Sequence, residues 1–182
     1  MISLNKDAKL SQHFSLGELT KTKHVTTDGN IPSHVAIENL KRICENWLED
    51  LRYSYNRLYV WNVNSAMPLA TAGTQEGGMW NENSSADEES EPIIINSGYR
   101  SPEVNRLAGG AANSNHLTGC AVDIRCAGKE QMIRYASILL DIADGTKQEF
   151  DELLLEQHGS VCWLHFAVRP KDNRRRIGFL KV

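Results

Sequence analysis

The sequence has little that would bind it to a membrane or to nucleic acid. Its 182 residues contain no run approaching the roughly 18 apolar residues that span a bilayer. The opening MISLNKDAKLSQHF lacks the apolar stretch of a secretory signal, so we expect a soluble protein that starts in the cytoplasm. The net charge of -3 and the pI of about 6.1 provide no basic field for polyanions. We therefore expect neither a membrane nor a nucleic acid as a partner.

The chain also lacks any C-x-x-C pair, which argues against a cysteine-based zinc site. Its four cysteines are Cys44, Cys120, Cys126 and Cys162. The first lies on the apolar face of a predicted helix, and Cys120 and Cys126 share strand parity with apolar neighbours, so we interpret them as core thiols. A disulfide is the less favoured alternative.

Residues 62–92 contain no lysine or arginine. Their glycines and the acidic run DEESE are typical of linkers. We predict an insertion within a single domain that comprises residues 1–182, with a contact to that domain through Trp80. A loop without a function of its own is the simplest interpretation of this insertion.

Helical and strand patterns follow one another in the rest of the chain without a regular β-α-β order, which favours an α+β fold. Helices are predicted at residues 14–20, 31–55, 101–110 and 128–145 from apolar spacing and capping signals. Strands are predicted at 93–95, 120–126, 150–157 and 161–168, the last two joined by a short turn. The run Ile93 to Ile95 is typical of a buried strand. The basic tail from Arg169 is interpreted as a solvated edge.

A histidine and an aspartate stand seven residues apart in the segment SNHLTGCAVD. Gly119 lies between His116 and Asp123 and permits a tight turn before the strand that carries the aspartate. A carboxylate in an otherwise apolar strand is costly unless it is paired or binds a cation. Histidine nitrogens and carboxylate oxygens are usual zinc ligands, and His165, which points away from its apolar neighbours in WLHFAV, can supply a third. Three protein ligands leave the open position of a catalytic zinc site.

The residues alone leave other interpretations open. Asp123 could pair with Arg125 or Arg100 instead of a metal, and a histidine in a strand is more often simply hydrogen-bonded than a ligand.

The segments SGYRSPEVN, SNHLTGCAVD, FDELLLE and WLHF together resemble the M15 family of zinc D-Ala-D-Ala carboxypeptidases and its phage-endolysin relatives. The resemblance runs from about Pro92 to Val168, and the opening of the chain also looks like a branch of the family found in phages and mobile elements. The related hedgehog signalling domain has the same zinc framework. The resemblance implies a hedgehog/DD-peptidase-like fold with a small antiparallel sheet packed against helices.

By position, the resemblance implies one zinc ion bound by His116, Asp123 and His165. It places Arg100, Ser114 and Tyr99 beside the substrate, where the arginine would bind a carboxylate or carbonyl. The alternative for Arg100 is a structural ion pair, and the alternative for Ser114 is a hydroxyl that caps a turn.

The catalytic base is the one point at which the sequence departs from the family pattern. Many members have an acid three residues before the last zinc histidine, where this chain has Cys162. The run FDELLLE resembles that of the closer branch, whose final glutamate lies on the adjoining strand, and this implies Glu156 as the base. If the hairpin loop is even-numbered, Glu152, Glu156, Trp163 and His165 share one face. A solvent-facing strand end is the alternative for Glu156.

The function implied is hydrolysis of an amide bond in peptidoglycan stem peptides, of the D-Ala-D-Ala carboxypeptidase or the L-Ala-D-Glu endopeptidase type. We expect a monomer that acts on the cell wall if released. The alternative is a non-catalytic, zinc-containing module that binds the cell wall. A metal-free structural protein is a third interpretation, and it leaves a buried Asp123 unexplained.

Overall fold

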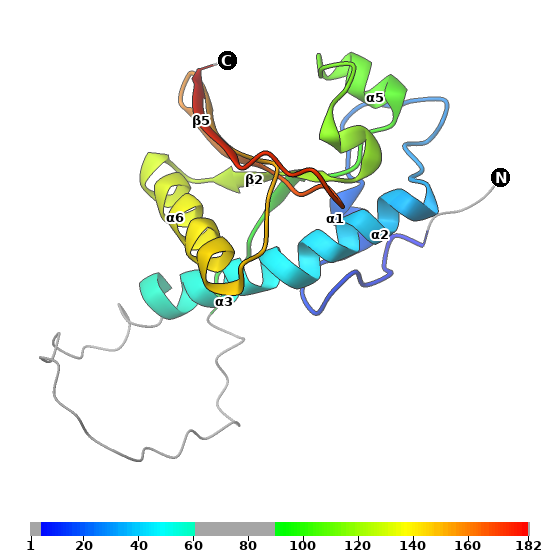
Figure 1. Cartoon of the computed structure of the whole chain (residues 1–182). Helices are drawn as coiled ribbons and strands as arrows, with labels where there is room; N and C mark the ends of the chain where they lie inside the picture. Colours follow the sequence, from blue (N-terminus) through cyan, green and yellow to red (C-terminus); the bar gives the residue numbers. More distant parts are fainter. Residues whose placement is uncertain (1–4, 61–89, 182) are drawn as a thin grey trace, which may run out of the picture.

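A computed structural model describes residues 5–60 and 90–181 (Figure 1). Its helices are α1 (Leu16–Leu19), α2 (His34–Ile43), α3 (Glu49–Tyr55), α5 (Pro102–Leu107) and α6 (Lys129–Thr146), with π-helical turns η1 (Cys44–Leu48) and η2 (Asn56–Val60) and a 3-10 turn η3 (Asn115–Thr118). Its strands are β1 (Ile95–Ser97), β2 (Ala121–Cys126), β3 (Glu152–His158), β4 (Val161–Ala167) and β5 (Arg176–Lys181). The strands form one sheet in the order β1-β2-β4-β3-β5, which confirms the α+β class.

The sheet is mixed: four strands form the expected antiparallel sheet, and a fifth is added in parallel at one edge. β1, β2, β4 and β3 pair antiparallel, whereas β5 runs parallel to β3. The reason is geometric: the short connection after β4 reverses the chain, and β5 then lies beyond β3, which already runs against β4. The tail from Arg169 therefore contains an edge strand that its high charge concealed from sequence reasoning.

The predicted buried strand at Ile93 to Ile95 is also corrected. β1 begins only at Ile95 and lies at the opposite edge of the sheet, with an irregular register to β2. Ile93 and Ile95 are buried, but Ile94 between them is 46% exposed. An edge strand has one side and part of one face open to solvent, so the run does not need to be buried throughout.

The helical stretch from α2 through η2 is continuous and lies against the sheet, on the same side as α6 (Figure 1). Ser33 caps its start by accepting a hydrogen bond from the Ala36 backbone N–H, so the helix begins at His34 and not at the predicted residue 31. Its predicted apolar face is buried and comprises Leu40, Ile43, Cys44, Trp47, Leu48, Leu51 and Tyr55. The indole of Trp47 packs edge-on against Phe166 of β4, with ring centroids 5.0 Å apart. None of the helices within residues 5–60 and 90–181 has the length and apolar content needed to cross a membrane.

The sheet has one apolar face and one polar face. Phe166 contacts the helices, so residues of its parity in β2, β3 and β4 form the core. Residues of the opposite parity, including Asp123, His165 and Glu156, face away from these helices. The fold thus places polar side chains from three adjacent strands on one surface.

A buried acid fixes the start of β3 to the segment before β5. Asp151 is fully buried and accepts hydrogen bonds from the Arg174 Nε at 2.8 Å and from the Asn115 Nδ2 at 2.9 Å. An Arg169 nitrogen lies 2.9 Å from the same carboxylate. Burial acts to raise the pKa of Asp151, but the bonds from Arg174 and Asn115 outweigh it and lower the pKa to about 2. Because Asn115 belongs to η3, this carboxylate also links β3 to the turn that carries His116.

The buried amide side chain of Asn56 joins the end of the long helix to the chain that leads into β1. Asn56 is fully buried, its Nδ2 donates to the Glu91 carbonyl at 3.0 Å, and its Oδ1 accepts from the Glu91 N–H at 2.7 Å. Residues 61–89, and with them most of the predicted insertion 62–92 and its Trp80, lie outside the described residues. The insertion stays a prediction, but the residues on either side of it are held together.

We predict that residues 64–88 can be replaced by a short Gly-Ser linker without loss of cooperative unfolding. The two bonds between Asn56 and Glu91 would keep the flanking chain in place, so the linker has little distance to cover. Thermal melting followed by circular dichroism measures this. Asn56→Ala in the full chain is the contrasting variant and should lower the free energy of unfolding by about 2 kcal/mol. A deletion variant that melts without a cooperative transition would show that the segment belongs to the core.

Candidate metal centre

The three predicted ligands come from η3, β2 and β4. Asp123 and His165 are register partners in the antiparallel pair β2–β4, so their side chains are neighbours on the polar face. His116 lies on η3, where the Ser114 Oγ accepts a hydrogen bond from the His116 N–H. Gly119 ends this turn with a φ of 69°, and a Cβ there would lie 2.3 Å from the Ala36 carbonyl oxygen. Only glycine fits this turn, which brings His116 back over Asp123.

The side-chain tips of these residues converge on one point. The His116 Nε2 lies 3.2 Å and the His165 Nδ1 lies 2.9 Å from the Oδ1 of Asp123. One ligand atom from each of the three residues lies within 4.8 Å of the other two. Ligands of a tetrahedral zinc at about 2.0–2.2 Å are about 3.3–3.6 Å apart, so small side-chain movements would let all three bind one ion.

Neighbouring groups orient two of these side chains. The His116 Nδ1 lies 2.6 Å from the Gly98 carbonyl oxygen, which can only accept, so Nδ1 donates to it and Nε2 faces the centre. The Oδ2 of Asp123 accepts a hydrogen bond from Arg100, whose Nε also donates to the Ser97 Oγ at 2.8 Å. Asp123 therefore offers one oxygen to the histidines and the other to an arginine.

The charges explain how a 7% exposed carboxylate is accommodated in β2. Burial acts to raise the pKa of Asp123, but the charges and hydrogen bonds of His116 and His165 outweigh it and hold that pKa well below its usual range. Burial acts to lower the pKa of His165, but hydrogen bonds to Asp123 and Glu152 raise it to about 9. The two carboxylates thus stabilise positive charge at this place, either as a proton on His165 or as a divalent cation.

Two glutamates of β3 flank His165 on the same face. His165 is directly opposite Leu154, so Glu152 and Glu156 are its two diagonal neighbours. The His165 contact, the largest influence, together with arginine contacts lowers the pKa of Glu152 to about 2 against the effect of burial. Burial raises the pKa of Glu156, which lies opposite Trp163. The two carboxyls therefore have pKa values displaced in opposite directions.

The residues predicted to contact the substrate all have contacts within the protein. Arg100 forms the ion pair with Asp123 that was its structural alternative, and Arg125 is exposed. Ser114 caps η3, and Tyr99 is buried in the core cluster. Their contacts with a substrate stay predictions.

Cys162 faces away from the centre. It pairs in register with Cys126, and both thiols are buried on the core side of the sheet. All four cysteines are free, which confirms the prediction of core thiols. Cys162 therefore lies on the opposite face of the sheet from His165.

Sequence reasoning missed part of the surroundings of the centre. Glu152 was placed on the correct face by parity but was given no role, and Asp151, Asn115 and Arg174 were not considered. The available signal was the position of Asn115 next to His116, since neighbours of a metal ligand commonly orient the site.

A comparison with models of protein families gives a match to part of the chain. The family model described as Peptidase M15 matches residues 78–150, less than half of the chain. This segment contains Arg100, His116 and Asp123 and ends before Glu152, Glu156 and His165. No curated protein matches the chain. This segment of the chain, which contains two of the three converging metal ligands, is therefore similar to peptidase M15.

Proposed function

We propose that the protein is a zinc-dependent peptidase that hydrolyses an amide bond in peptidoglycan stem peptides. The bond is of the D-Ala-D-Ala carboxypeptidase or the L-Ala-D-Glu endopeptidase type. The observation that carries the proposal is the convergence of His116, Asp123 and His165, with a glutamate of raised pKa on the same face. The match of residues 78–150 to the M15 family model supports the reaction class.

The donor set fits zinc, because two imidazoles and one carboxylate are common ligands of catalytic zinc. A zinc ion bound there supplies an acidified water and polarises the scissile carbonyl. His116 and Asp123 are already oriented for such a ligand role by the Gly98 carbonyl and by Arg100.

Glu156 is suited to move the proton. It would accept a proton from the attacking water and return it to the leaving amine, which requires a pKa closer to neutrality than that of an ordinary carboxylate. Burial shifts the pKa of Glu156 in that direction, whereas the pKa of Glu152 is lowered. Because the two pKa values are shifted in opposite directions, Glu156 is suited to carry the proton and Glu152 to remain charged.

Arg100 would hold the substrate next to the ligands. Its guanidinium contacts Asp123 from the side opposite the histidines and is largely buried, which limits its movement. Asp123 contacts one terminal nitrogen of this guanidinium. The other terminal nitrogen can donate to a peptide carboxylate or carbonyl.

The alternative proposal is a zinc-containing module that binds the cell wall without cutting it. The thiol at position 162, where many relatives carry an acid, favours this alternative. It predicts zinc binding and wall binding without hydrolysis, so a mass-spectrometric assay on muropeptides distinguishes it from the enzyme.

We predict that zinc binding releases a proton from His165 and strengthens with rising pH. In protein stripped of metal, the raised pKa of His165 stabilises the fold fully below about 6.5, and this contribution is lost as the pH rises through about 9. Zinc requires the neutral imidazole, so its apparent affinity should rise about tenfold per pH unit between pH 7 and 9. Calorimetric titration in buffers of different ionisation enthalpy measures both effects.

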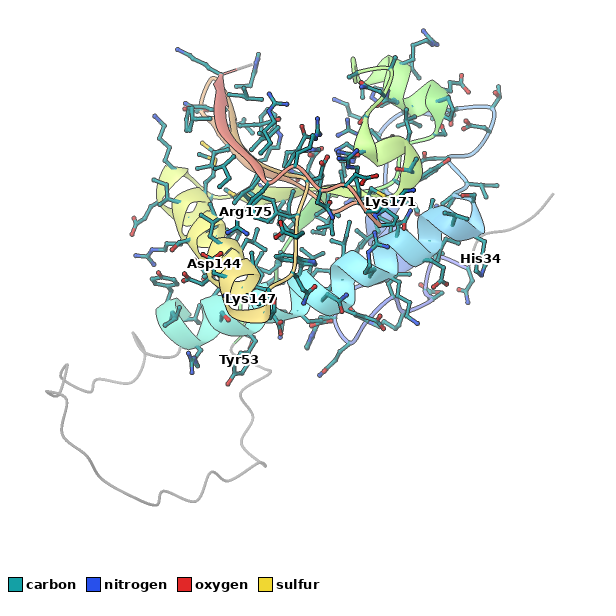
Figure 2. The ribbon with its side chains drawn as sticks, in the orientation of Figure 1. His34, Tyr53, Asp144, Lys147, Lys171 and Arg175 are labelled. Carbon is teal, nitrogen blue, oxygen red and sulfur yellow. The ribbon has the colours of Figure 1, made fainter. Side chains whose placement is uncertain are left out.

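The matched control is a histidine far from the centre. His165→Ala should abolish tight zinc uptake, whereas His34→Ala, an exposed residue at the start of α2 (Figure 2), should leave it unchanged. Equal zinc uptake by His165→Ala and wild type would exclude this ligand set.

We predict that Glu156→Gln retains zinc and lowers turnover of a muropeptide substrate by about 100-fold or more. Glutamine has the shape of glutamate but cannot accept and return the proton. Cys162→Ser should change turnover little, because that side chain is on the core face. An active Glu156→Gln together with an inactive Cys162→Ser would reverse the assignment of the base.

A further inference from the structure

The Glu152 carboxylate is held by groups from three different segments. Its Oε1 lies 3.0 Å from the Arg176 Nη1 and 3.0 Å from the Arg174 Nη2. Its Oε2 accepts from the Asn115 Nδ2 at 3.3 Å and lies 3.6 Å from the His165 Nε2. One oxygen thus faces the C-terminal arginines, and the other faces the metal centre.

The two ring nitrogens of His165 have different surroundings. Nδ1 is the nitrogen close to Asp123 and is therefore the one that can bind an ion shared with Asp123 and His116. Nε2 points to the Glu152 carboxylate. An imidazole that binds a metal through one nitrogen carries its proton on the other, and an acceptor at that proton fixes the tautomer and the ring orientation.

We propose that Glu152 is the positioning residue of the metal centre: it accepts the Nε2–H of His165 and is held in place by Arg176 and Arg174 of the C-terminal segment. This inference rests on the proposed zinc site. It assigns to the basic tail a role beyond that of a solvated edge.

His116, the other histidine of the centre, has the same kind of acceptor. There the Gly98 carbonyl accepts from the nitrogen that faces away from the centre. Within the described residues His165 contacts the carboxylates of Asp123 and Glu152, and Glu152 is the one at Nε2. The contact of 3.6 Å is slightly longer than a hydrogen bond, and a small rotation of the 12% exposed imidazole would close it.

A merely structural role for Glu152, as an anchor of β5, makes a different prediction. An anchor would alter thermal stability but would leave zinc affinity and the His165 tautomer unchanged. Arg176 separates the two roles, because its side chain is 54% exposed and binds Glu152, whereas Arg174 also binds the buried Asp151.

The test measures zinc affinity by chelator competition and the His165 tautomer by ¹⁵N NMR. Glu152→Ala should weaken zinc binding by about 10- to 100-fold and remove the uniform Nε2–H signature. Glu152→Gln should restore much of both, because an amide oxygen also accepts an N–H. Arg176→Ala should produce a smaller loss in the same direction, and it remains informative if Glu152→Ala does not fold.

The matched control is Asp144→Ala. Asp144 of α6 pairs with Arg175, which lies between the two arginines that hold Glu152 (Figure 2). Zinc affinity should not change in this variant. Wild-type affinity, within about twofold, and an unchanged His165 signature in Glu152→Ala would overturn the positioning role, given the larger effect expected of an outer-shell carboxylate. Zinc binding with no hydrolysis in the wild type would overturn the proposed function alone, and a wild type that binds no zinc would overturn both.

Discussion

The buried carboxylate of Asp123 is the constraint on which the rest of the centre depends. It lies in the interior strand β2 between the buried Val122 and Ile124, where an unpaired charge would be costly. The side chains that contact this carboxylate supply positive charge or a proton: His116 from a turn, His165 from the adjacent strand and Arg100 from the loop after β1. A site that concentrates compensating groups in this way is also ready to accept a divalent cation.

The C-terminal segment is part of this arrangement. Asp151 and Glu152 are consecutive residues, one buried and one beside His165, and both are bound by Arg174. Asn115, next to His116, donates to both carboxylates. The chain that follows β4 therefore contacts both the fold and the surroundings of the ligands, so stability and metal affinity are coupled through the same few side chains.

Much of the fold could be predicted from local patterns. The apolar face of residues 40–55 and the shared face of Glu156 and His165 follow from periods of 3.6 and 2, which are properties of single elements. The parallel pairing of β5 and the exposure of Ile94 could not be predicted in this way, because they depend on the order of strands in the sheet. The sequence also does not decide whether Asp123 pairs with Arg100 or Arg125, because the choice depends on how the loop after β1 packs against β2. The contact of Glu152 with the tail required β5 to be placed first.

The hairpin turn between β3 and β4 has a consequence for how the protein can vary. It consists of Gly159 and Ser160, with a φ of 58° at the glycine, and it fixes Glu156 opposite Trp163. Alternation means that a slip of one residue would turn His165 toward the helices and bring Phe166 to the polar surface. A single inserted residue in this exposed turn could therefore separate the proton carrier from the metal ligands without altering either. Natural variants should tolerate substitutions there more readily than changes in length.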